Sequence, residues 1–258
     1  MAGGRPTPSA TTGDSTSLAG KVALVTGAGR RVGRGIALAL GREGMRLAVH
    51  FHASRRGADE TVRMLVDLGA MAEVFGADLL DATVAPILIA RVTSHFGRLD
   101  LVVNSAASMI RTPFGEITPA QWDEIMALNL RAPAFLSQAA AAPLAEQHGS
   151  IVNIGDHMGE EPWPAYLAHG VAKAGVVALT RHLAAAMAPA VRVNGVVPGA
   201  VLAPEGWGSA SQDEFARATP LQRLGSVDDV AGAVLYLAGA PYVTGEVIHV
   251  DGGRHVRR

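Results

Sequence analysis

Seven short apolar runs, separated by segments with helical spacing, constrain the fold of this 258-residue chain more than any other feature. Such runs are typical of strands buried on both faces of a parallel sheet. Strands that alternate with helices indicate a parallel sheet with helices on both faces. We therefore predict one α/β domain over residues 18–258, a doubly wound parallel sheet of about seven strands. The predicted strands lie at residues 22–26, 47–51, 72–78, 99–107, 149–155, 191–197 and 245–253.

Three other segments have distinct patterns. The longest predicted helix covers residues 118–147, where Thr118 is placed to cap it and Pro119 suits its first turn. Residues 203–225 are mostly small and polar, and we expect them to form a mobile loop over the substrate. Residues 1–17 lack an apolar stretch, so we expect a disordered tail rather than a signal peptide.

The composition excludes several classes of function. The chain has no cysteine, which rules out disulfides, thiolate catalysis and cysteine-ligated metals. Its net charge of −1 gives no electrostatic reason to expect nucleic acid or an anionic membrane as a partner. No apolar run reaches the roughly 18–20 residues of a membrane span, and no histidine pair has a third ligand at metal-binding spacing. We expect a cytoplasmic protein that acts on a small molecule, without a metal, a nucleic-acid partner or a membrane partner.

A glycine-rich turn follows the first predicted strand. Gly27, Gly29 and Gly33 lie between this strand and its helix. Glycines there let the backbone approach a pyrophosphate, and the helix N-terminus supplies free N–H donors and a positive dipole. The turn by itself also fits an ordinary strand-to-helix connection, but its place after the first strand favours a dinucleotide site. We therefore expect a Rossmann-type fold that binds a dinucleotide.

The end of the second predicted strand indicates which dinucleotide is bound. NAD-binding proteins often have an acidic residue there for the ribose 2′-hydroxyl, whereas this chain has none. It has His52, Ser54 and Arg55 instead, and Arg30 and Arg31 come from the glycine-rich turn. Hydroxyl, imidazole and guanidinium donors suit a 2′-phosphate, although a solvated basic loop is the alternative interpretation. We predict NADPH as the cofactor.

Several short motifs, in order, resemble the short-chain dehydrogenase/reductase family over essentially the whole chain after the tail. They are "TGAGRRVG", "ADL", "NSAA", "ALNLRAP", "GSIVNIG", "RVNGVVPG" and "VTGEVIHVDGG". Within the family the chain looks most like the pteridine reductases and their dihydromonapterin reductase branch. Arg31 replaces a usual glycine, "HFHAS" is similar to that subgroup's phosphate-binding loop, and Asp156 stands where most of the family has a catalytic serine. "DGGRHVRR" at the C-terminus points the same way.

The resemblance implies a homotetramer and a set of cofactor contacts. Lys173 would bind the nicotinamide ribose and lower the pKa of a neighbouring acid, and Asn129 would hold a water in a proton relay. The other implied cofactor-binding residues are Gly27, Gly29, Arg30, Arg31, Val32 and Gly33 in the turn, Asp78 and Leu79 beside the adenine, Asn104 and Ala106 along the ribose, and Pro198, Gly199 and Val201 near the carboxamide.

One catalytic position departs from the family pattern. Four residues before Lys173, where the family has its tyrosine acid, this chain has His169. Helical spacing puts both side chains on one face, with Tyr166 one turn earlier and roughly 4.5 Å along the axis. A phenol that far away is expected to contact substrate, or simply to pack, rather than replace the missing acid.

The altered residues favour a different reaction. Free histidine titrates at about 6.5 and free tyrosine at about 10, so histidine is a doubtful proton donor for the alkoxide that carbonyl reduction develops. A protonated C=N bond is already electrophilic, and the Asp156 carboxylate suits its charge. We predict hydride transfer to a C=N bond of a pteridine-like or other cyclic imine, with Asp156, His169 and Lys173 in place of Ser, Tyr and Lys. Ketone reduction and a non-redox NADP(H)-binding relative (cyclase, dehydratase, isomerase or cofactor sensor) are the alternatives.

Aromatic and apolar residues near these positions are candidates for the substrate pocket. Trp207 is placed to stack on a flat ring, and Trp163 and Met158 to form the opposite wall. Each also fits ordinary packing. His157 is expected to lie in a solvated loop rather than in the pocket.

Overall fold

The computed structural model describes residues 17–202 and 208–256, and within them the predicted sheet is confirmed. Seven parallel strands are ordered β3-β2-β1-β4-β5-β6-β7. Apart from Ser17, the expected tail at residues 1–17 lies outside the described residues. The strands are β1 (Val22–Val25), β2 (Arg46–Phe51), β3 (Ala72–Gly76), β4 (Leu101–Asn104), β5 (Ser150–Ile154), β6 (Arg192–Pro198) and β7 (Val247–Val250).

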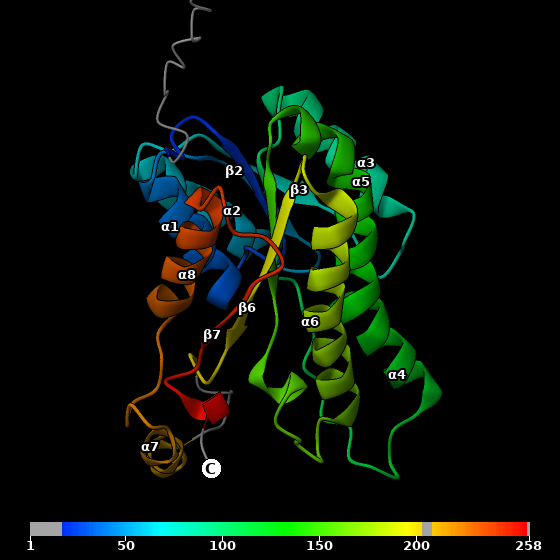
Figure 1. Ribbon diagram of the computed structural model, residues 1–258, viewed down its shortest axis with the longest axis vertical. Helices are drawn as coiled ribbons and strands as arrows, with labels where there is room; N and C mark the ends of the chain where they lie inside the picture. The colour runs from blue at the N-terminus through cyan, green and yellow to red at the C-terminus, as the bar shows by residue number, and fades with distance from the viewer. Residues whose placement is uncertain (1–16, 203–207, 257–258) are drawn as a thin grey trace, which may run out of the picture.

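Helices cover both faces of this sheet, as Figure 1 shows. The helices α1 (Arg31–Arg42), α2 (Arg55–Asp67) and α8 (Val227–Gly239) share one apolar core with the sheet. The helices α3 (Val84–Phe96), α5 (Ala132–Glu146) and α6 (Leu167–Met187) lie on the other face over a second core. Because strand residues belong to both cores, the strands had to be apolar on both sides. Among the helices that the structure describes, none combines the length and hydropathy that crossing a bilayer requires.

The long helix expected at residues 118–147 is interrupted. Thr118 caps α4 (Pro119–Met126) in a capping box with Gln121, as its position suggested. A π-helical turn at Ala127–Arg131 then separates α4 from α5. The insertion of such a turn widens the helix locally and is frequent at functional sites. It contains Asn129, which periodicity alone does not single out.

The segment expected to be a mobile loop contains a helix. Part of the segment, residues 203–207, lies outside the described residues, but α7 (Ser209–Ala218) follows directly. Phe215 on α7 is buried. The segment is mostly polar, so its composition does not show that Phe215 packs α7 against the rest of the protein.

The strand order reverses between β1 and β4, and the ends of these two strands are packed together. The Thr26 hydroxyl accepts hydrogen bonds from the N–H groups of Ser105 and Ala106, both at 2.9 Å. Gly27 has φ +67°, and a Cβ built on it would lie 3.0 Å from Ala106 Cα. Only glycine fits this approach. In open α/β sheets ligands bind at this topological switch point, which directs attention to the carboxyl ends of the strands.

Candidate active site

The glycine-rich turn forms a cradle that larger residues would fill. A Cβ on Gly33 would lie 2.5 Å from the Gly27 carbonyl oxygen, and one on Gly29 would lie 3.2 Å from the Ser54 carbonyl oxygen. The first turn of α1 has no acidic residue, and Arg30 and Arg31 are exposed beside it. Free backbone donors at a helix N-terminus, without a repelling carboxylate, fit a pyrophosphate. Arg31 has φ +51°, a left-handed conformation that explains the glycine usual at this position.

The predicted phosphate-binding residues lie together after β2. The Ser54 side chain precedes α2 without capping it. Arg55 lies over the Phe51 ring and pairs with Asp59 at 2.9 Å, with its side chain 65% exposed. The imidazole of His52 lies 3.7 Å from Asp78. Val32 is partly exposed in the first turn of α1, whereas Leu79 is buried beside Asp78.

A buried histidine that sequence reasoning missed connects these segments. His50 on β2 accepts a hydrogen bond from the Gly27 N–H at 3.2 Å, and its Nε2 donates to the Ala77 carbonyl oxygen at 3.1 Å. Burial lowers the pKa of His50 from 6.5 to about 4, against the opposing effect of the bond to Ala77. The only signal in the sequence is one histidine within the apolar run "LAVHF". Neutral His50 therefore connects the glycine-rich turn, at Gly27, to Ala77, the residue after β3.

His50 predicts a specific loss of stability in acid. Below pH 6.5 the unfolded chain binds a proton at this position, whereas the folded chain does so only below about pH 4. The contribution of His50 is therefore complete above pH 6.5, and about 3 kcal/mol of it is lost as the pH falls to 4. Urea unfolding across this range should show a shallower pH dependence for His50→Gln than for the unmodified protein. Parallel pH profiles would contradict the assignment.

Two glycines allow the loop after β5 to rest directly on α6. A Cβ on Gly159 would lie 2.7 Å from the Ala174 nitrogen, and one on Gly170 would lie 2.8 Å from the Met158 carbonyl oxygen. Asp156 caps the short 3-10 turn η2 (His157–Gly159) by accepting the Met158 N–H at 2.8 Å. This close packing brings an aspartate at the end of a strand next to a helix that begins eleven residues later.

The contact that results joins two of the predicted catalytic residues. Oδ2 of Asp156 lies 3.5 Å from Nε2 of His169, whose side chain is 3% exposed. Nδ1 of His169 lies 3.0 Å from the Ser108 carbonyl oxygen, so this nitrogen carries a proton and donates. A second proton, on Nε2, would face the Asp156 carboxylate. Nε2 is itself buried and makes no hydrogen bond among the described residues.

Asn129 reaches this pair through the backbone of Ser108. Its side-chain amide accepts from the Ser108 N–H and donates to the Ser108 carbonyl oxygen, both at 2.9 Å. Its nitrogen also lies 3.4 Å from Nδ1 of His169. The π-helical turn thus fixes the loop that orients the histidine.

The charges of the site favour an ionised aspartate. Burial raises the pKa of Asp156, but contacts with His157 and His169 outweigh it and hold that pKa well below its usual range. Lys173 is 5% exposed and donates to the Ile154 carbonyl oxygen at 2.8 Å. Burial lowers the pKa of Lys173, and Asp156 partly offsets this. Because the Asp156 side chain is 25% exposed, the carboxylate rather than His169 is the member of the pair that reaches solvent.

The expectation that His157 lies in a solvated loop is wrong. Its side chain is buried, with Nδ1 3.2 Å from Asp156 and the ring edge-on to those of Trp163 and Phe215. Neither ring nitrogen has a hydrogen-bond partner among the described residues. Phe215 on α7 contributes one of these ring contacts, which the sequence around His157 does not reveal.

The remaining candidates have different surroundings. Tyr166 directly precedes α6, with its ring centroid 6.5 Å from that of Trp163, whereas Met158 is buried within η2. Asn104 donates to Asn153 across β4 and β5 at 2.8 Å. Trp207 lies outside the described residues. At the ends of β6 and β7, Pro198 and Val201 are buried and Gly199 lies against the backbone of Asp251.

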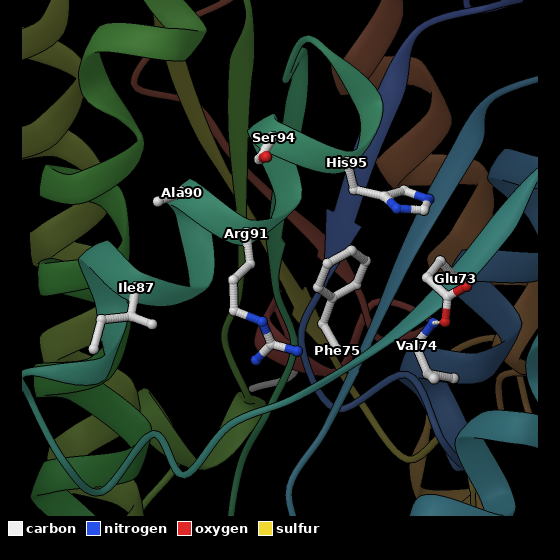
Figure 2. A pocket seen from close by; sticks show the side chains of 8 residues that line it. All are labelled: Glu73, Val74, Phe75, Ile87, Ala90, Arg91, Ser94 and His95. Atoms are coloured by element: carbon white, nitrogen blue, oxygen red, sulfur yellow. Dashed lines mark hydrogen bonds between the residues drawn. The ribbon is translucent and has the colours of Figure 1, made fainter.

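A hollow of about 930 Å³ lies elsewhere, between β3 and α3 (Figure 2). It is lined by Phe75, Arg91 and His95 among others, and none of the catalytic candidates faces it. Arg91 crosses it to bond the Gly76 carbonyl oxygen at 2.9 Å. Within the described residues, no cluster of histidine and acidic side chains is arranged to hold a metal ion.

Comparisons with known proteins show the family to which this fold belongs. A family described as "Enoyl-(Acyl carrier protein) reductase" matches residues 27–255. A putative ketoacyl reductase 2 of the granaticin polyketide synthase from Streptomyces violaceoruber is 37% identical, over 91% of this chain and 96% of that protein. The 3-oxoacyl-[acyl-carrier-protein] reductase FabG of Staphylococcus aureus is 32% identical, over 92% and 98% of the two chains. The chain belongs to the short-chain dehydrogenase/reductase family.

A solved structure agrees with this membership. A putative short-chain alcohol dehydrogenase from Sinorhizobium meliloti superposes with a TM-score of 0.89 at 30% identity, covering 94% of this chain and 99% of that one. As a short-chain dehydrogenase/reductase, this protein is an oxidoreductase that works with a nicotinamide cofactor. The cradle of Gly27, Gly29 and Gly33 fits the pyrophosphate of such a cofactor.

Proposed function

We propose that the protein is an NADPH-dependent reductase that transfers hydride to a C=N bond of a pteridine-like or other cyclic imine. The observation that carries the proposal is the 3.5 Å contact between Asp156 and His169, the residue that the family resemblance puts in place of the usual acid. In this pair the more exposed group is a carboxylate. A carboxylate stabilises a cation or an N–H group and repels a developing alkoxide.

The cofactor, when bound, supplies the hydride. The glycine-rich turn would hold its pyrophosphate, and Lys173 would bind the ribose hydroxyls near the nicotinamide. His52, Ser54 and Arg55, together with Arg30 and Arg31, would hold a 2′-phosphate. The support for NADPH is the exposed guanidinium groups and the Ser54 hydroxyl, which does not cap α2.

The protein's own residues then have separate roles in the reduction. Asp156 would pair with the protonated imine nitrogen and keep the C=N carbon electrophilic. Hydride addition to that carbon gives an amine that retains the proton already on nitrogen, so no acid has to act during the transfer. His169 would keep Asp156 ionised, and each imine nitrogen would take its proton from solvent before the substrate binds. Tyr166, Trp163, Met158 and Trp207 remain our candidates for substrate contacts.

Ketone reduction is the second candidate, because the relatives from Streptomyces violaceoruber and Staphylococcus aureus are named as ketoacyl and oxoacyl reductases. It would require His169 to give its proton to an alkoxide. The 3% exposure of the His169 side chain, and the carboxylate in front of Nε2, weigh against this route. The non-redox alternative has no support from relatives named as reductases.

Steady-state oxidation of NADPH with a matched substrate panel tests the function. We expect turnover of dihydropteridines and of 3,4-dihydroisoquinoline, with kcat/KM at least about 10-fold above that for ketones of similar size. NADPH should bind about 10-fold or more tightly than NADH, because each charge-assisted bond to the 2′-phosphate contributes roughly 1.5–3 kcal/mol. Turnover of ketones without turnover of imines would refute the proposed reaction, and equal affinity for the two cofactors would refute the phosphate site.

We also propose that residues 18–258 form one domain and that the protein is a cytoplasmic homotetramer. One sheet runs through all the described strands, and the absence of cysteine is in keeping with a reducing compartment. The family resemblance implies the tetramer. Tyr236 on α8 is 57% exposed, and a second copy of the chain would bury this aromatic side chain.

A further inference from the structure

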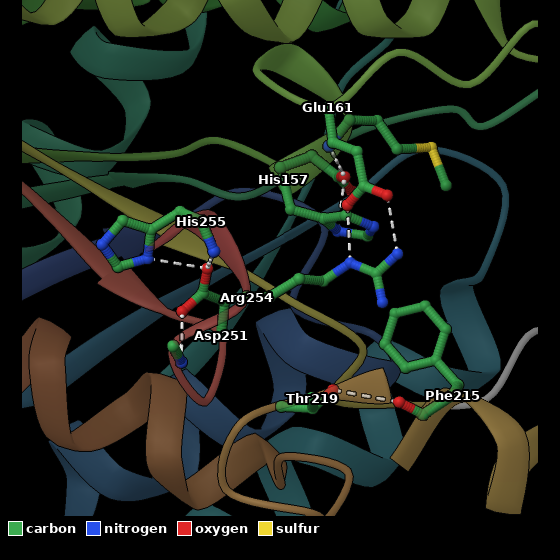
Figure 3. A network of polar contacts seen from close by, with 10 residues as sticks. His157, Glu161, Phe215, Thr219, Asp251, Arg254 and His255 are labelled. Carbon is green, nitrogen blue, oxygen red and sulfur yellow. Dashed lines mark hydrogen bonds and ion pairs between the residues drawn. The ribbon is translucent and has the colours of Figure 1, made fainter. Parts of the chain in front are cut away.

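Arg254, near the C-terminus, has an unusual environment beside the catalytic loop. Its side chain is 9% exposed, and it lies over the Phe215 ring at 4.0 Å (Figure 3). Glu161 accepts from its Nε at 2.6 Å and from its Nη2 at 2.7 Å. Nη1 is buried and has no hydrogen-bond partner among the described residues.

The geometry of the guanidinium group leaves one edge without a hydrogen-bond partner. Arginine has five N–H donors in a planar fork, and a carboxylate bound at Nε and Nη2 uses two of them. The three that remain lie on Nη1 and Nη2, two of them parallel at the end of the fork, where a second planar oxyanion fits. A buried charged donor without a partner is costly, so this edge requires an explanation.

A cavity of about 430 Å³ adjoins Arg254 and the catalytic loop. Arg254 and His157 both line it. The acidic residues around the cavity are already paired with basic side chains, so the cavity repels an anion less than its composition suggests. Glu160 pairs with His249 at 2.8 Å, and Asp251 binds both His255 and backbone N–H groups.

His157 connects the cavity to Asp156, because it lines the cavity and contacts that carboxylate. His157 follows Asp156 directly in the chain, with Nδ1 3.2 Å from that carboxylate and its ring centroid 6.1 Å from that of Phe215. Phe215 in turn covers Arg254. A substrate that placed its imine at Asp156 would therefore extend past His157 toward the guanidinium.

We propose that Arg254 is a specificity-determining residue, which binds a carboxylate on the substrate at the end of the guanidinium fork. The substrate would thus be a flat ring compound with an acidic group on the side away from the reacting bond. The inference rests on the reductase function proposed above but does not depend on whether the reduced bond is C=N or C=O.

Pairs of acids and esters test the subsite. The probes are 3,4-dihydroisoquinolines with a carboxylate at each open position of the benzene ring, and their methyl esters. For at least one position the acid should have a KM about 10- to 100-fold lower than its ester, with similar kcat. Arg254→Met should abolish this preference by raising the KM of the acid and leaving that of the ester unchanged. Arg254→Lys, which keeps the charge but lacks the fork, should retain only part of it.

The controls separate substrate binding from a structural role. Arg223 also forms a fork with a carboxylate, that of Asp229, but it does not line the cavity, so Arg223→Met should leave the acid-to-ester ratio unchanged. An equal rise in KM for acid and ester in Arg254→Met would overturn the proposal. Quenching of tryptophan fluorescence in the NADP⁺ complex measures binding without turnover, because Trp163 lies 6.0 Å from Arg254. Equal binding of acids and esters there would overturn the subsite alone, whereas tight binding without reduction would overturn only the proposed function.

Discussion

Asp156→Asn is expected to lower kcat for cyclic imines by on the order of 10²–10³-fold, the usual effect of removing one group that stabilises charge in a transition state. The amide has nearly the shape of the carboxylate and is still able to accept the Met158 N–H. It cannot, however, offset the charge of an iminium or of His169. The measurement is single-turnover oxidation of NADPH with 3,4-dihydroisoquinoline.

NADPH affinity and the unfolding midpoint are the controls for this variant. Asn194→Asp, which would disturb a buried amide outside the site in a comparable way, is the matched control variant. We expect Asp156→Asn to bind NADPH as the unmodified protein does, since the glycine-rich turn is unchanged. If the rate of imine reduction is unaffected, the carboxylate is not the group that stabilises the iminium, and the proposed chemistry fails.

His169→Tyr is expected to produce a gain of ketone reduction, by about 100-fold or more. A phenol at this position is longer than imidazole and lies one helical turn from Lys173, whose charge favours the phenolate and strengthens the acid. It would reach past the Ser108 carbonyl oxygen, to which His169 is bonded. Steady-state rates with ketones and imines, measured side by side, report the change of preference.

His169→Phe is the matched control for size, since it lacks only the hydroxyl group of tyrosine. It should bind NADPH and remain folded, but should gain no ketone reduction. A gain in both variants would show that space rather than acidity limits the native site. No gain in the tyrosine variant, with cofactor binding intact, would show that the site differs from its relatives in more than this residue.

Much of the architecture followed from local patterns in the sequence. Apolar runs alternating with helical segments were enough to predict the parallel sheet, because a strand between two helical layers must be apolar on both faces. The glycine-rich turn was recognisable for a similar reason, since Gly27 and Gly33 occupy positions where a Cβ would collide with backbone. His169 and Lys173 could be placed on one helical face because their spacing is one turn.

Only the tertiary structure decided how these residues meet. The contact of Asp156 with His169 depends on Gly159 and Gly170, which let a loop and a helix touch at backbone distance. The fork of Arg254 on Glu161 joins residues 93 apart in the chain, and the burial of His157 depends on Phe215, from a different helix. Periodicity reports which side of a helix or strand is buried, but not which distant segment buries it. The charge state of the site, and the cavity beside it, are properties of those distant contacts.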